Sequence, residues 1–153
     1  METAICTTIK SISRDEWEAC RSSRAGGDPF LSYDFFFLLE TSNSVGPKTG
    51  WIPFYIIFKE KNTVVGIIIS FLKNHSQGEY VFDHSWADAY ERSGGNYYPK
   101  LQVAVPFTPV SGERILVRSE YEDKVGEMIS SAKRQVEKNN LSSLHITFCN
   151  KSF

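Results

Sequence analysis

The chain has 153 residues, and its 17 Lys and Arg residues nearly balance its 18 Asp and Glu residues, giving a formal net charge of −1. A near-neutral chain with no block of basic residues does not match a protein that binds a phosphate backbone, so we expect no DNA partner. The length is typical of one domain that buries a sizeable core.

We expect no membrane span, because the most apolar run, residues 64–72, is only about half as long as a transmembrane helix. The first residues lack the basic and apolar segments of a secretory signal. Cys6, Cys20 and Cys149 are odd in number and widely spaced, with no C-x-x-C pair. That pattern favours reduced thiols over a disulfide framework or a zinc site, and we expect a cytoplasmic protein.

The chain begins with a β-prone segment, residues 4–9, which we interpret as an edge strand. Ser13 and Glu16 have the spacing of a capping box, in which each side chain accepts from the backbone amide of the other residue. This pattern predicts a helix of about two turns that ends before the glycine- and proline-containing loop at 26–29.

A second helix is predicted from a cap at Ser32 through about Thr41, followed by a loop over residues 42–50. Residues 51–59 and 63–73 are rich in β-branched and aromatic side chains, and the short polar segment between them indicates a hairpin. The second arm is continuously apolar, so we expect it to be a central strand covered on both faces.

Residues 79–83 are interpreted as a strand, residues 85–92 as a short helix and residues 101–105 as another strand. Pro106 and Pro109 lack an amide donor, so the sheet should open near them.

The C-terminal part of the chain predicts a helix and a strand. A second capping box at Ser119 and Glu122 precedes apolar residues at helical spacing, which predict an amphipathic helix ending near residues 139–140. Met128 lies in that stripe and is expected in the core. Residues 144–148 alternate as in a final strand.

The stretch from Lys73 to Pro109 concentrates side chains that can move protons among aromatic rings, as a substrate cleft requires. Its ionisable members are His75, Glu79, Asp83, His84, Asp88, Glu91 and Lys100, and its large aromatics include Tyr80, Phe82, Trp86, Tyr90, Tyr97 and Tyr98. The alternative is a strand and turn whose charges face water.

The order of residues in this stretch is more specific than its composition. H-S-x-G-E-Y-V-F-D begins at His75, W-A-D-A-Y at Trp86, and G-G-x-Y-Y-P-K-L-Q-V-A-V-P-F-T-P-V-x-G at Gly94. With segments 29–32, 39–40 and 50–51, these strings closely resemble a bacterial family of FemAB-like predicted N-acyltransferases. That family was formerly labelled peptidoglycan biosynthesis or recognition and is related to the GNAT acyltransferases.

The resemblance implies an α+β (α/β) fold with a GNAT-like mixed, mainly antiparallel sheet flanked by helices. It also implies that residues 1–153 form a single GNAT-like domain, the N-terminal part of a longer architecture, with the sheet incomplete at its C-terminal end. We therefore expect association with a missing C-terminal half or with a second copy.

N-acyl transfer needs a group that takes a proton from the amine. On a strand, Glu79 and Asp83 would point to the same face, and their proximity would raise one pKa toward neutrality. The resemblance favours them as bases, although both could be exposed strand residues. His75 is a candidate base or proton relay, and Tyr98 a candidate donor to the leaving thiolate. The spacing of His75, Glu79, Asp83 and His84 matches no strong metal-ligand signature.

Other residues are assigned to ligand binding. Tyr97 either helps Tyr98 or forms a wall of the substrate pocket, Lys100 contacts an acidic group of donor or acceptor, and Trp86, Asp88 and Tyr90 line the acceptor side.

For the acyl donor we assign Val103 and Val105 together with a loop in which Ser111, Gly112 and Arg114 would bind phosphates. Acyl-CoA is the expected co-substrate, with an amine as acceptor. The loop lacks the Q/R-x-x-G-x-G/A string of typical acetyl-CoA enzymes, and FemAB proteins proper use aminoacyl-tRNA. A binding module without catalysis, for a peptidoglycan-like or amino-sugar ligand, and an inactive truncated fragment are the alternatives.

Overall fold

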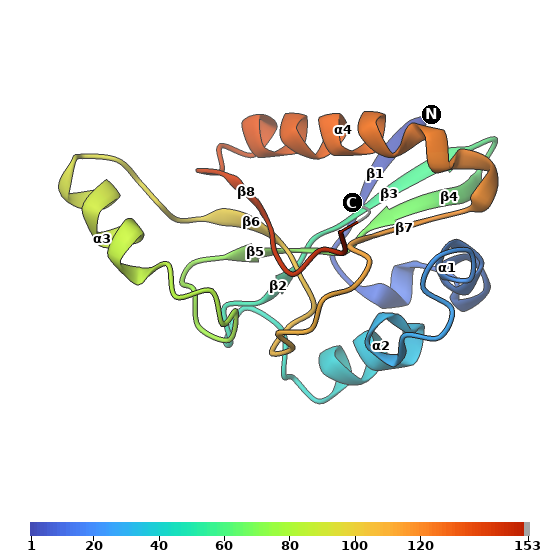
Figure 1. The fold of residues 1–153 in the computed structure, drawn as a ribbon, viewed down its shortest axis with the longest axis horizontal. Coiled ribbons are helices and arrows are strands. Elements are labelled where there is room, and N and C mark those ends of the chain that lie inside the picture. The colour runs from blue at the N-terminus through green and yellow to red at the C-terminus, as the bar shows by residue number, and fades with distance from the viewer. Residues whose placement is uncertain (152–153) are drawn as a thin grey trace.

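A computed structural model describes residues 1–151 as two sheets with helices packed around them (Figure 1). The elements in chain order are β1 (Glu2–Cys6), η1 (Ile9–Ser11), α1 (Arg14–Arg21), η2 (Pro29–Leu31), α2 (Tyr33–Thr41), β2 (Ile52–Pro53), β3 (Tyr55–Glu60), β4 (Thr63–Ile68), β5 (Ser70–Lys73), α3 (His84–Arg92), β6 (Lys100–Val103), β7 (Ile115–Val117), η3 (Ser119–Lys124), α4 (Val125–Lys138) and β8 (Leu144–Ile146). The α+β class is confirmed.

The strands divide between two four-stranded sheets, with the orders β1-β3-β4-β7 and β2-β5-β6-β8. Neighbouring strands are antiparallel except for β6 and β8, which are parallel. The mainly antiparallel character is as predicted, but one continuous sheet was expected. β1 lies at the edge of the first sheet, as predicted, although it begins and ends earlier than residues 4–9.

The hairpin predicted around residues 60–62 links the two sheets. Lys61 and Asn62 form its two-residue turn with φ of 49° and 67°, as a type I′ turn requires. Each arm is interrupted once, at Phe54 and at Ile69, so the part near the turn joins the first sheet and the far part joins the second.

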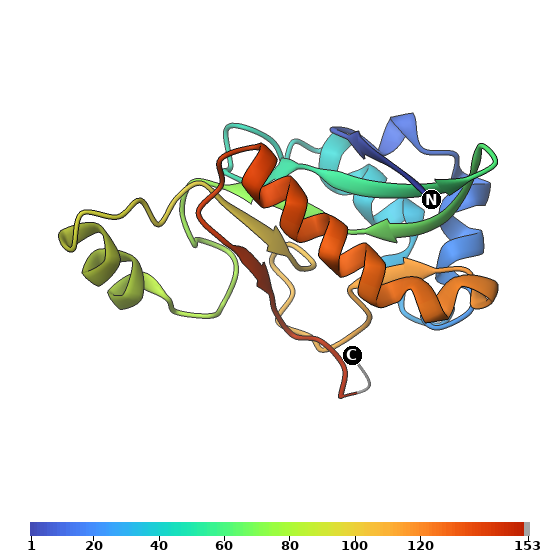
Figure 2. The same cartoon turned by 90° about the horizontal axis from the view of Figure 1, so that it is seen from above.

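Both faces of the first sheet are covered, as the continuous apolar arm predicted. Tyr55 and Ile57 pack in the core cluster on the side of α1 and α2. Ile56 and Phe58 pack in the cluster that contains Met128 of α4. Figures 1 and 2 show α4 crossing one side of the strands while α1 and α2 lie on the other.

The second sheet has two chemically different faces. Leu101 and Val103 of β6 pack beneath α4 with Leu144 and Ile146 of β8. The intervening residues face the opposite side, because side chains alternate along a strand. There Lys73 pairs in register with Lys100, and Gln102 pairs with His145. We call the side formed by Lys73, Lys100, Gln102 and His145 the polar face.

Both predicted capping boxes are wrong, although the helices exist. Ser13 makes no side-chain cap hydrogen bond, and Glu16 Oε1 instead accepts from the Val64 amide at 3.1 Å. Ser119 lies in a 3-10 helix and contacts Glu120 rather than a helix amide. The cap predicted at Ser32 is confirmed, because its hydroxyl accepts from the Phe35 amide.

The strand predicted at residues 79–83 is wrong. Tyr80 and Phe82 have φ of 59° and 54°, which is incompatible with a regular strand, and the segment is a loop over the polar face. The helix after it, α3, is confirmed and ends before Gly94, whose φ is 89°. α3 projects from the body of the molecule (Figure 1).

Candidate functional site

Lys100 is the centre of a buried charged cluster on the polar face. Its ammonium donates to Glu79 Oε2 at 2.7 Å, to Asp83 Oδ2 at 2.9 Å and to Ser76 Oγ at 3.1 Å. β6 supplies the lysine, and the loop between β5 and α3 supplies the three oxygens. An ammonium has three donors, so all of them are used.

Lys73 is the second buried cation. Its Nζ donates to the Gln77 carbonyl at 3.0 Å, lies 3.9 Å from Glu79 Oε1 and is 3.7 Å from the centre of the Trp51 ring. Burial lowers the pKa of Lys73 to about 8, and the attraction of Glu79 only partly opposes that effect. The cluster therefore contains two lysine side chains and two carboxyl groups.

Two tyrosines close the cluster. Tyr97 donates its hydroxyl to Asp83 Oδ2 at 2.7 Å, and the Tyr98 hydroxyl shares a 2.6 Å hydrogen bond with Ser76 Oγ. Glu79, Asp83 and Tyr98 are thus brought together, although the strand geometry from which this was predicted is absent. Glu79 and Asp83 contact Lys100 directly, and Tyr98 reaches it through Ser76.

The two carboxyl groups have opposite pKa shifts. Burial raises the pKa of Glu79 above its usual value, despite the lowering effect of Lys100. Burial also acts to raise the pKa of Asp83, but contacts with Ser76, Lys100 and Tyr97 outweigh it and hold that pKa well below its usual range. Asp83 is therefore a fixed anion, and Glu79 is the carboxyl group closer to proton exchange at neutral pH.

Unpaired polar atoms gather at the same place. Among residues 1–151, the buried side-chain atoms without a hydrogen-bond partner are Glu79 Oε1, Asp83 Oδ1, Gln102 Oε1 and Trp51 Nε1. All four side chains lie on or against the polar face. Buried polar atoms normally find a partner, so water or a ligand is expected here. Three of the four atoms are acceptors, which favours a ligand that donates hydrogen bonds, such as an amine.

His75 lies at the margin of this cluster. Its Nδ1 accepts from the Gln77 amide at 3.1 Å, and its ring packs against Gly50, where a Cβ atom would lie 2.1 Å from Nε2. Burial and the nearby Lys73 charge lower its pKa. The contacts found for the described residues do not join it to Glu79 or Asp83.

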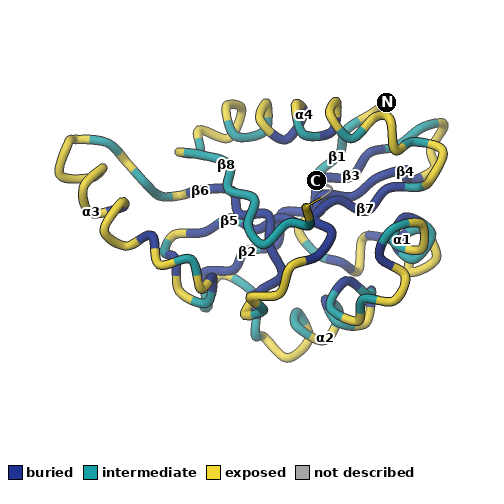
Figure 3. The backbone as a smooth tube through the Cα atoms, in the orientation of Figure 1, coloured by how far each residue is buried: buried dark blue, intermediate teal, exposed yellow. Residues whose placement is uncertain are grey.

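The predicted acceptor-side residues on α3 are largely exposed. Trp86 is 75% exposed, and Asp88 and Tyr90 are exposed as well. Figure 3 shows that most residues of α3 are exposed, whereas those of β5 and β6 are mostly buried. Tyr97, by contrast, lies in the cluster.

The loop predicted to bind phosphates already has partners. The Gly112 amide donates to the Phe148 carbonyl at 3.0 Å. Arg114, 1% exposed, donates through its guanidinium to the carbonyls of Thr147, Glu113 and Val110. An anion at this loop would have to displace these contacts, although the hydroxyl-bearing Ser111 is exposed.

Val103 and Val105, also assigned to the donor, are buried in two different core clusters, so their side chains face other apolar groups.

Lys73, Ser76, Gln102 and His145 were not selected from the sequence as site residues. A signal was present in two of the strands that carry them. Lys100-Leu101-Gln102-Val103 and Leu144-His145-Ile146 alternate polar and apolar residues at strand spacing. Polar residues that recur within apolar strands indicate a face that is not ordinary core.

Comparison with protein families places the chain in a known family. A family model described as peptidoglycan biosynthesis/recognition, FemAB-like, matches residues 8–153. The chain belongs to the FemAB-like family. The match extends over the cluster, the polar face and the α3 projection of this FemAB-like chain. Comparisons with curated proteins and with solved structures gave no match.

Within residues 1–151 of the FemAB-like chain, none of the helices has the length and apolar character needed to cross a membrane. That part of the chain also has no group of three or more His, Cys, Asp or Glu side chains arranged to hold a metal ion.

Proposed function

We propose that this FemAB-like chain transfers an acyl group from a thioester, with acyl-CoA as the donor, to an amine on a peptidoglycan-like substrate. The observation that carries the proposal is the convergence of Glu79 and Asp83 on Lys100, with one oxygen of each carboxylate lacking a hydrogen bond. An ammonium or amine group is the ligand that such acceptors favour.

In this proposal the acceptor amine attacks the acyl carbonyl carbon, a C–N bond forms and the C–S bond breaks. Glu79 takes the amine proton through its unpaired Oε1, since its pKa is raised by burial. Asp83 stays ionised and orients the amine, and Tyr98 supplies a proton to the leaving thiolate. The Arg114 guanidinium already donates to the carbonyls of Thr147, Glu113 and Val110. The phosphates of the acyl donor therefore have no assigned partner.

The covering loop must open for this reaction, because Glu79 is only 4% exposed. Residues 74–83 cover the cluster, and within that segment Tyr80 and Phe82 have positive φ and exposed rings. The buried polar contacts of Ser76, Glu79 and Asp83 with Lys100 hold this segment, so a substrate that opens it has to replace those contacts.

The test is thiol release from acyl-CoA in the presence of an amino-sugar acceptor. Glu79→Gln keeps the shape of the side chain but removes the base, and we expect a loss of rate of at least about a hundredfold. Glu91→Gln, an exposed change on α3, is the matched control and should leave the rate unchanged. Equal rates for wild type and Glu79→Gln would contradict the proposed base.

A second candidate function is recognition of a peptidoglycan-like ligand without catalysis. It is favoured by the exposed aromatic rings of Tyr80, Phe82 and Trp86, since large exposed aromatic side chains mark interaction surfaces. Glycan binding that is saturable and weakened by Trp86→Ala, without any thioester turnover, would support this candidate over the first. Association with a C-terminal half or a second copy stays a prediction.

A further inference from the structure

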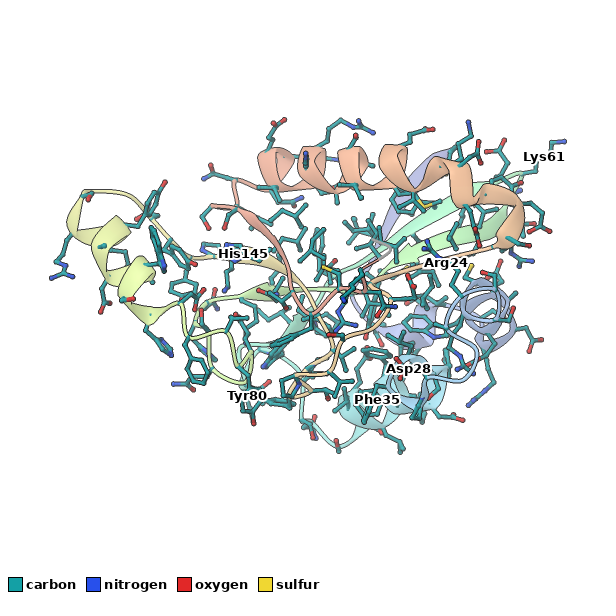
Figure 4. All side chains as sticks on the ribbon, viewed as in Figure 1. Arg24, Asp28, Phe35, Lys61, Tyr80 and His145 are labelled. Atoms are coloured by element: carbon teal, nitrogen blue, oxygen red, sulfur yellow. The ribbon has the colours of Figure 1, made fainter. Side chains whose placement is uncertain are left out.

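A small cavity lies beside the charged cluster, between the α3 projection and the start of β8. It has a volume of about 150 Å³ and is lined by Tyr90, Tyr97, Ser142, Ser143 and His145. Figure 4 shows His145 near β6 and β8, on the side of the molecule toward α3. Tyr97 belongs to both places, because its ring lines the cavity and its hydroxyl donates to Asp83.

The size of the cavity limits its ligand to one ring. Each water in the liquid occupies about 30 Å³, so this volume corresponds to about five waters. A cavity of similar size in another protein accepts benzene. One six-membered ring fits, whereas a whole disaccharide would extend out of the cavity.

The walls are apolar on one side and polar on the other. The Tyr90 and Tyr97 rings lie 6.2 Å apart at 71° and present aromatic surface. On the other side, Ser143 Oγ and His145 Nε2 share a hydrogen bond of 2.8 Å, and Ser142 donates to the Tyr97 carbonyl. These hydroxyl and imidazole groups give that side of the cavity a capacity for further hydrogen bonds, which a flat apolar ligand would not use.

The charge of the cavity favours a neutral ligand. Burial, and then the nearby Lys100, lower the pKa of His145, so its imidazole is neutral at neutral pH. None of the five lining residues carries an acidic or basic side chain apart from this histidine. A phosphate or carboxylate ligand would therefore have no cation in the cavity to bind.

We propose that this cavity binds one pyranose ring of an amino sugar, with a C–H face against Tyr90 and Tyr97 and its hydroxyls toward Ser143 and His145. A pyranose has both an apolar face, formed by axial C–H groups, and a polar edge, formed by its hydroxyl groups. Tyr97 then connects the bound ring to Asp83 and the charged cluster. The choice of an amino sugar rests on the proposed function, whereas ring binding does not require catalysis.

Gly95 positions one wall of this cavity. A Cβ atom at Gly95 would lie 2.4 Å from Tyr90 Cε1, so the ring can keep its place only beside a glycine. Gly95 does not have positive φ, so an alanine would act through the ring rather than through the backbone. Gly27, where a Cβ atom would meet nothing within 4 Å, offers a matched control.

The experiment measures saturation-transfer NMR from the full chain to N-acetylglucosamine and to glucosamine, without acyl donor. We expect transfer to the ring protons, and binding at least about fivefold weaker in Tyr90→Ala, Ser143→Ala and Gly95→Ala. Gly27→Ala should bind as wild type. Because Tyr90 is 51% exposed, its truncation should leave the chain folded, which circular dichroism checks.

Two outcomes would overturn the cavity. One is the absence of saturation transfer at sugar concentrations up to the high millimolar range. The other is sugar binding that is lost in Trp86→Ala but kept in Tyr90→Ala and Gly95→Ala, which would place the sugar on the outer side of α3. Failure of the proposed catalysis is separate, because thiol release with a small amine that lacks a ring does not depend on the cavity. Glu79→Gln should lose that release and keep sugar binding.

Discussion

Lys100 Nζ donates a hydrogen bond of 2.7 Å to Glu79 Oε2, and neither side chain has any exposed area. Removing two charges from water is costly, and the attraction between them compensates only while both are present. Asp83 is the third member of this contact, and Ser76 the fourth. The β5–α3 loop is therefore attached to β6 mainly through polar groups.

Replacing Lys100 with methionine should lower the free energy of unfolding by about 3–5 kcal/mol, because Glu79 and Asp83 would stay buried without a cation. Urea denaturation measures the change. Lys133→Met, on the exposed side of α4, is the control and should have little effect. Adding Glu79→Gln to Lys100→Met should recover part of the loss, and strictly additive losses would contradict the coupling.

Lys73 should titrate with a midpoint near pH 8, below its ordinary value of 10.5, because burial disfavours its charged form. NMR titration of the Lys73 side chain measures it directly. Between these pH values the unfolded chain binds more protons than the folded chain, so the free energy of unfolding should rise with pH. Lys73→Met should lack that rise, and a midpoint near 10.5 in wild type would refute the prediction.

The two helix caps should respond differently to loss of a hydroxyl. Ser32→Ala should cost about 1 kcal/mol of stability, since the Ser32 side chain accepts from the Phe35 amide. Ser13→Ala should cost only a few tenths, because Ser13 makes no such bond. Urea denaturation of both variants is the measurement. Equal costs would mean that the capping box of Ser13 and Glu16 forms after all.

Arg114→Lys keeps the charge but loses the planar donors, so it should destabilise the chain by at least about 2 kcal/mol. The reason is that the buried carbonyls of Thr147, Glu113 and Val110 would lose partners. Thermal and urea unfolding check this. If the variant were as stable as wild type but bound acyl-CoA more weakly, Arg114 would be a donor-binding residue instead.

Local patterns in the sequence determined much of the fold. The polar residues at 60–62 between two β-rich arms gave the hairpin, and the continuous apolar run of residues 64–69 implied cover on both faces. The cap at Ser32 and the helix α3 followed the same logic. These features depend on backbone angles and nearest neighbours, which a single stretch of sequence specifies.

Tertiary structure decided which partner each buried polar side chain reached. Glu16 bonds to the Val64 amide, 48 residues away, rather than to its own helix. Tyr80 and Phe82 are residue types that favour strands, but they lie in a loop. The path of this loop brings Glu79 and Asp83 to Lys100. A buried polar group bonds to whatever acceptor or donor lies beside it, and that neighbour exists only once the sheets have packed.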